Sequence, residues 1–93
     1  MDSRIRNIKE LLKNKFAANY PGTIVQVGSG FGDNIHVRII SPHFEEMPRS
    51  KRDDEIWGIL EELPEEDVLR ISLCILLSPS EAPQFEYIYQ EVA

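Results

Sequence analysis

Cysteine and histidine, the residues that most often build disulfides and metal sites, are scarce in this sequence. Its 93 residues contain one cysteine, Cys74, and two histidines, His36 and His43. A single thiol excludes a disulfide within the chain and any four-cysteine zinc or iron–sulfur site. Seven positions separate the two histidines, so in one continued strand they would face opposite sides. We therefore expect no metal site, with His36 as the only candidate ligand.

Long apolar runs are missing as well. The longest apolar stretch, around residues 74–77, is far too short to span a bilayer. The first sixteen residues carry a charge every few positions, unlike the apolar segment of a signal peptide. A lone cysteine is also typical of a reducing compartment. These features predict a soluble cytoplasmic protein.

Positive charge is in the minority. Ten Lys and Arg residues stand against sixteen Asp and Glu, which gives a net charge of −6 and argues against a freestanding nucleic-acid binder. The charge is unevenly placed: six basic and three acidic groups give +3 over residues 1–44, and four against thirteen give −9 over residues 45–93. Either the protein has a basic and an acidic face that orient a charged partner, or solvated helix faces simply differ in sign.

Catalytic motifs are absent too. The glycine-rich segment 28–32 joins two expected strands and opens no helix, so it is not a phosphate-binding fingerprint. The adjacent carboxylates Glu61-Glu62 and Glu65-Glu66 have no burying pocket around them, and no serine lies in a nucleophile-elbow motif. The sequence therefore predicts no enzyme.

Hydrophobic periodicity predicts an α+β domain. Apolar positions recur at helical spacing from Ile5 to Phe16, and short β-branched runs at 23–27 and 35–40 predict a hairpin. A helical turn is expected over 43–47, and a helix carrying Ile56, Ile59, Leu60 and Leu63 follows, opened by a Ser50–Asp53 capping box. The acidic segment 64–67 is expected to break this helix.

The last strand is predicted over residues 69–77. Leu69, Ile71, Leu73, Ile75 and Leu77 alternate with other residues, which predicts that Leu73 faces the core and Cys74 the other side. A final helix is expected from Ser78 into the tail 82–93, with apolar residues Phe85, Ile88, Tyr89 and Val92. The prediction is one domain over 1–93 with a core of about 3–81, in the order α-β-β-α-α-β-α, and helices on one face of a three-stranded sheet.

Residues 36–60 run from a predicted strand through Ser41 and Phe44 to the basic pair Lys51-Arg52, and in this order they resemble the central segment of the BolA family. Members typically have a strand, then Ser-x-x-Phe-x-Gly, then a helix that starts with basic residues. Ser41, Phe44, Met47, Lys51 and Arg52 fall in that order here, and the segment 77–81 is similar to the family's ending of the last strand. The resemblance implies a KH-like fold and a non-catalytic regulator that partners monothiol glutaredoxins, often across a shared [2Fe–2S] cluster.

The chain also departs from the family pattern at informative positions. Glu46 stands where the family has glycine, and Asp53-Asp54 stands in place of a His-Arg pair. The family's ligand histidine, at the head of the last strand, falls near Leu69 or Arg70, and its second ligand falls near Asn34. With no histidine at the strand head, we expect this chain to hold no cluster of its own.

Three binding hypotheses follow. The first is an adapter that contacts a protein partner through Phe31 and Asp33 in the hairpin loop and through Phe44, Met47 and Arg49. The second is a KH-like nucleic-acid binder; its candidate phosphate contacts are Arg38, Arg49, Lys51 and Arg52. The acids that follow at 53–55 would repel a nucleic-acid backbone. The third is a homodimer that pairs an exposed strand edge.

Overall fold

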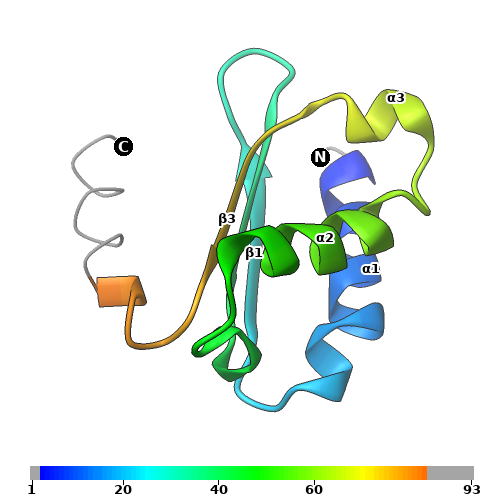
Figure 1. Cartoon of the computed structure of the whole chain (residues 1–93). Coiled ribbons are helices and arrows are strands. Elements are labelled where there is room, and N and C mark those ends of the chain that lie inside the picture. Colours follow the sequence, from blue (N-terminus) through cyan, green and yellow to red (C-terminus); the bar gives the residue numbers. More distant parts are fainter. Residues whose placement is uncertain (1–2, 84–93) are drawn as a thin grey trace.

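The computed structural model describes residues 3–83 (Figure 1). The helices and strands are α1 (Ser3–Lys15), β1 (Ile24–Ser29), β2 (Ile35–Ile40), α2 (Arg49–Leu60), α3 (Glu65–Val68) and β3 (Ile71–Leu77), with 3₁₀ turns η1 (Ala17–Asn19) and η2 (Pro42–Phe44). The hairpin, the helical turn after it, the long second helix and the last strand are confirmed. The predicted C-terminal helix lies outside the described residues. None of the helices in the described range is long and apolar enough to cross a membrane.

The three strands form one mixed sheet in the order β1-β2-β3. Strands β1 and β2 pair antiparallel, with Ile24 opposite Ile40, and β2 and β3 pair parallel, with Ile40 opposite Leu77. A parallel pair needs a crossover connection, and the segment that contains α2 and α3 supplies it. Strand β2 is thus the centre of the sheet, and β1 and β3 are its edges.

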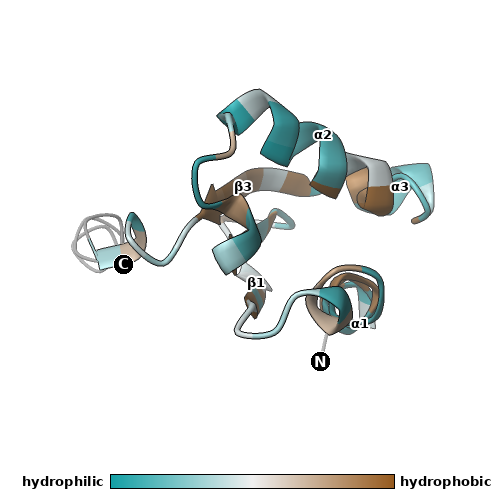
Figure 2. Ribbon diagram, turned by 60° about the horizontal axis from the view of Figure 1, so that its bottom comes forward, coloured by the Kyte–Doolittle hydropathy of each residue, from teal (hydrophilic) through white to brown (hydrophobic). Residues whose placement is uncertain are grey.

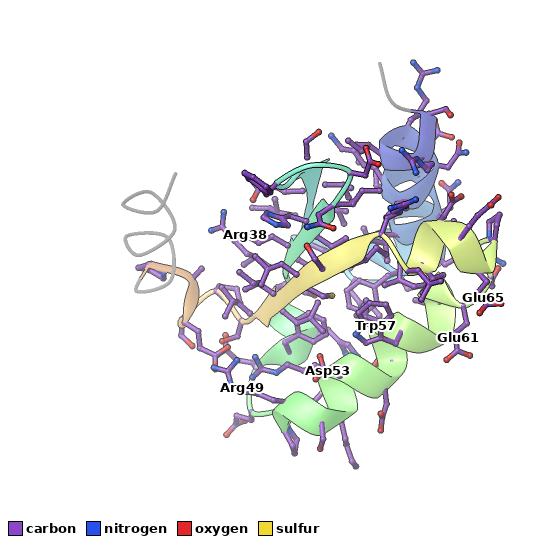
Figure 3. The ribbon with its side chains drawn as sticks, turned by 90° about the horizontal axis from the view of Figure 1, so that it is seen from above. Arg38, Arg49, Asp53, Trp57, Glu61 and Glu65 are labelled. Atoms are coloured by element: carbon purple, nitrogen blue, oxygen red, sulfur yellow. The ribbon has the colours of Figure 1, made fainter. Side chains whose placement is uncertain are left out.

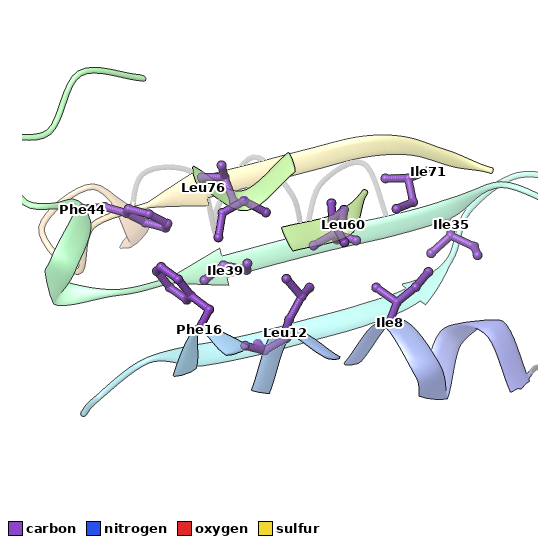
Figure 4. Packing of buried hydrophobic residues seen from close by; sticks show 12 residues of the cluster. Ile8, Leu12, Phe16, Ile35, Ile39, Phe44, Leu60, Ile71 and Leu76 are labelled. Atoms are coloured by element: carbon purple, nitrogen blue, oxygen red, sulfur yellow. The ribbon is translucent and has the colours of Figure 1, made fainter. Parts of the chain in front are cut away.

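Helices α1 and α2 lie on the same face of this sheet, as predicted. Ile8 and Leu12 of α1 are fully buried with Ile56 and Leu60 of α2, and Ile39 of β2 lies in the same cluster (Figure 4). Burying side chains of this size contributes roughly 1.5–3 kcal/mol each. The strands are correspondingly hydrophobic, whereas the outer turns of α2 are hydrophilic (Figure 2).

The expected orientation of β3 is confirmed at Ile71 and was wrong beyond it. A register shift occurs between Ile35 and His36, and beyond it Val37 pairs with Cys74 and Ile39 pairs with Leu76. The shift reverses the alternation, so that Cys74 and Leu76 pack toward the helices. Leu73 is 38% exposed, so it is not a core residue.

Two details of the crossover also differ from expectation. Helix α2 begins at Arg49, so Ser50 is already inside it, and no side chain caps its start; the Pro48 carbonyl accepts from the amides of Lys51 (3.1 Å) and Arg52 (3.2 Å). The predicted acidic break contains the one-turn helix α3, whose acidic residues suit the positive end of a helix.

Candidate functional site

One end of the sheet brings together two segments that are distant in the sequence. The amide of Ile35, at the end of the β1–β2 loop, donates to the carbonyl of Arg70 at 2.8 Å. Beside this bond, Arg70 Nη1 lies 3.9 Å from Asp33 Oδ2. We use the name hairpin surface for Phe31, Asp33, Leu69 and Arg70, because the first two belong to the hairpin loop, the last two come just before β3, and these two segments meet at this end of the sheet (Figure 1).

The hairpin surface exposes large apolar side chains. Phe31 is 92% exposed and Leu69 is 75% exposed, more than any other large hydrophobic residue in the described range. The nearby ion pair is also open to solvent, so it contributes at most about 1 kcal/mol to folding. Exposed apolar residues beside charged groups are typical of surfaces that bind other proteins. Phe31 and Asp33 were predicted as contacts, whereas Leu69 was expected in the strand.

The side chains of this surface do not fit the cluster that the BolA resemblance implies. The segments that would carry the two ligands do lie side by side, but they present Asp33 and Arg70. A guanidinium has no lone pair for a metal. Across residues 3–83, no group of three or more His, Cys, Asp or Glu side chains could hold a metal ion. The imidazole of His36, the candidate ligand, lies directly against Gly30.

Phe44 is a core residue and not a partner contact, contrary to prediction. Its side chain is fully buried, and its ring stacks on that of Phe16 with centroids 5.3 Å apart. The neighbouring Met47 is half-buried against the same cluster. Phe44 of the family-like Phe-x-x-Met spacing therefore anchors η2 to the core, whereas Met47 keeps part of its side chain exposed.

The burial of Arg52 is the least expected feature of the structure, because this charged residue is only 4% exposed. Its Nε donates to the Met47 carbonyl at 2.9 Å, and its Nη1 donates to the Leu76 carbonyl at 3.0 Å. The charge is balanced by Glu81, whose Oε1 lies 2.7 Å from Nη1. The same Glu81 oxygen accepts from the Ser78 amide at 2.8 Å. These contacts join α2, β3 and the segment after β3, and they prevent Arg52 from reaching a phosphate.

The four basic residues proposed as phosphate contacts do not converge. Arg38 is buried on the face of the sheet opposite α2, where its Nη1 donates to Gln26 Oε1 at 2.8 Å. Arg49 lies at the start of α2, on the other side of β3, 3.9 Å from Glu81 (Figure 3). Of these four residues, only Arg49 and Lys51 have exposed side chains. The nucleic-acid hypothesis therefore loses both Arg38 and Arg52.

A further side-chain group was missed in the sequence. His43 stacks on Tyr20 with ring centroids 3.8 Å apart, and its Nε2 lies 3.0 Å from Glu55 Oε1. The group joins η2 to Tyr20, the residue after η1, and to α2. No sequence signal identified it, because its members are distant along the chain.

The cleft between α2 and β3 is small. Its volume is about 180 Å³, below the roughly 300 Å³ at which small-molecule sites begin, and its lining includes Arg49, Asp53 and Cys74. Burial, reinforced by the nearby Asp53 carboxylate, raises the pKa of Cys74 to about 12. The thiol therefore stays protonated at neutral pH and is a poor nucleophile.

No family model and no curated protein matches the sequence. Among solved structures, BolA1 from Arabidopsis thaliana is similar, with a TM-score of 0.59, 20% identity and coverage of 89% of this chain and 100% of that one. The BolA domain of SufE1 from Arabidopsis thaliana is also similar, with a TM-score of 0.57, 23% identity and coverage of 87% and 98%. The BolA-like fold expected from residues 36–60 is thereby confirmed.

Proposed function

We propose that this protein is a small, non-catalytic adapter or regulator in the cytoplasm, and that it binds a protein partner through the hairpin surface. The partner class implied by the BolA resemblance is a monothiol glutaredoxin. One observation carries the proposal: the two most exposed large apolar side chains of residues 3–83, Phe31 and Leu69, belong to the two segments that meet where the family's ligands would stand.

The chemistry of the contact follows from the side chains present. The segments that carry the family's ligands present Asp33 and Arg70 to each other here, so we expect this chain to contribute hydrogen bonds, charge and apolar area, and no bond to a cluster. Aromatic anchors such as Phe31 give most of the binding energy when they enter a partner's pocket, and charged rim groups mainly set orientation. Truncating the Phe31 side chain should therefore weaken binding more than raising the salt concentration does.

The test is a titration with a monothiol glutaredoxin of the same organism, apo and cluster-loaded, followed by two-dimensional NMR and by absorbance. We expect shifts around residues 31–35 and 69–71 with an unchanged cluster spectrum. The double variant Phe31→Ala, Leu69→Ala should weaken binding at least about tenfold. The matched control is Ile24→Ala, which also truncates an exposed apolar side chain, 50% exposed, but at the other end of β1.

Three results would contradict the proposal in whole or in part. Equal weakening by Ile24→Ala and by the double variant would remove the hairpin surface from the interface. An altered cluster spectrum would mean that this chain supplies a ligand after all. Absence of any binding would leave the fold in place and exclude glutaredoxin as the partner.

A further inference from the structure

Within residues 3–83, strand β1 is an edge of the sheet, and no charge or proline in the strand itself protects it. Native proteins guard sheet edges with charges, prolines or covering elements, because open edges pair with other strands. Here no charged side chain occurs from Phe16 to Gly32, and β1 itself (Ile24–Ser29) contains no proline. The other edge, β3, is different, because Arg52 of α2 already donates a hydrogen bond to the Leu76 carbonyl there.

The hairpin fixes which backbone groups of β1 point outward. The amide of Gly30 donates to the Asn34 carbonyl at 2.7 Å, so the hydrogen-bonded pairs continue at Gly28–His36 and Gln26–Arg38. The alternate residues Val25 and Val27 therefore direct their N–H and C=O groups away from β2. An added strand would pair with these groups.

Helix α1 places positive charge beside this edge. Lys15 lies 4.0 Å from Glu62, so the flank of α1 that carries Lys15 faces the end of α2. Arg6, Lys9 and Lys13 recur at helical spacing on the opposite flank of the buried Ile8–Leu12 stripe, toward the outer side of β1. Because α1 packs over β1, these groups would overhang a strand added there.

We propose that the β1 edge binds an extended acidic segment of a partner protein by strand addition. Side chains of the added strand that share the face of Val25 and Val27 would lie beneath the basic flank of α1, so every second residue should be acidic. A second copy of this chain fits less well, because pairing β1 with β1 would bring two basic α1 flanks together. This inference rests on the proposal that the protein acts by binding proteins, and it adds a second surface and a partner chemistry.

The probe is a capped peptide of about seven residues, the length of a strand, that alternates glutamate and threonine. We expect it to protect the outward amides of Val25 and Val27 from hydrogen exchange, without protecting β3. A peptide that alternates lysine and threonine should bind about tenfold more weakly or not at all. A peptide of the same composition with its glutamates in one block should also bind more weakly.

Two exposed lysines give a matched pair of variants. Lys13→Glu reverses a charge on the flank above β1 and should weaken peptide binding about three- to fivefold, the upper end of the range for one exposed ion pair. Lys15→Glu makes the same change on the α2 flank and should alter binding less than about twofold. Val27→Pro removes an outward amide that the hairpin does not use, so it should abolish binding while the β1–β2 shifts persist.

Three outcomes would overturn the inference: equal weakening by Lys13→Glu and Lys15→Glu, unchanged exchange at Val25 and Val27 with saturating peptide, or a dimer that pairs β1 with β1 in light scattering and NMR. The glutaredoxin titration measures binding at the hairpin surface, and the peptide titration measures binding at the β1 edge. Either proposal can therefore fail alone.

Discussion

Replacing Glu81 by glutamine should destabilise the protein in a pH-dependent way. Arg52 and the Ser78 amide hold the pKa of the Glu81 carboxyl at about 2 instead of 4.5. A difference of this size corresponds to at most about 3 kcal/mol of folding free energy. About a third of the Glu81 side chain reaches solvent, which screens the pair, so we expect Glu81→Gln to lose about 2 kcal/mol at pH 7.

The sign of the pH dependence follows from the lowered pKa. The stabilisation is fully present above pH 4.5 and is lost as the pH falls through the folded-state value near 2. The gap between wild type and Glu81→Gln should therefore shrink steadily below pH 4.5. Urea unfolding followed by fluorescence of the single tryptophan, Trp57, measures this gap at each pH.

The control variant is Glu61→Gln, which neutralises an exposed carboxylate at the end of α2. It should change stability by less than about 0.5 kcal/mol at every pH. A gap for Glu81→Gln that stays constant from pH 7 to pH 3 would refute the assignment of Glu81 as the charge partner of Arg52. The loss would then come from packing.

Three other predictions concern single side chains. Glu46 has φ 62°, a left-handed conformation that suits glycine, so Glu46→Gly should stabilise the protein by about 0.5–1 kcal/mol in urea unfolding, whereas Glu46→Ala should not. Phe44→Ala should cost about 3–5 kcal/mol in the same assay, yet leave glutaredoxin affinity unchanged below the unfolding midpoint; a selective loss of binding would contradict its place in the core. Cys74 should react with a thiol reagent at pH 7 at least about tenfold more slowly in the folded than in the urea-unfolded chain, and equal rates would show that its burial is wrong.

The parts of the fold that local pattern determines were predictable. The spacing of Ile8, Leu12 and Phe16 located α1 and its buried side, because apolar residues four positions apart lie on the same face of a helix. The hairpin followed from two β-branched runs around a glycine-rich loop. The Ser-x-x-Phe segment then indicated the BolA-like order of elements, which the solved structures confirm.

The rest depends on contacts between distant segments. Alternation in residues 69–77 identifies a strand, but a single register shift against β2 decides whether Leu73 or Cys74 faces the helices. The burial of Arg52 depends on carbonyls of Met47 and Leu76 that no sequence pattern reveals. Within the candidate site, Phe31 and Asp33 were identified from the loop sequence. Leu69 and Arg70 are distant from them in the sequence, and only the folded structure brings the two segments together.

The mixed sheet constrains the order in which this chain can fold. The β1–β2 hairpin needs only local contacts and can form while the chain is being made, but the far side of β2 stays unpaired until residues 71–77 have left the ribosome. Until then Val37 and Ile39 lack the strand and helix that bury them, and the buried arginine lacks a counter-charge that follows 29 positions later. A nascent or truncated chain that ends within the crossover should therefore expose the unpaired edge of β2 and be a preferred substrate for chaperones and proteases.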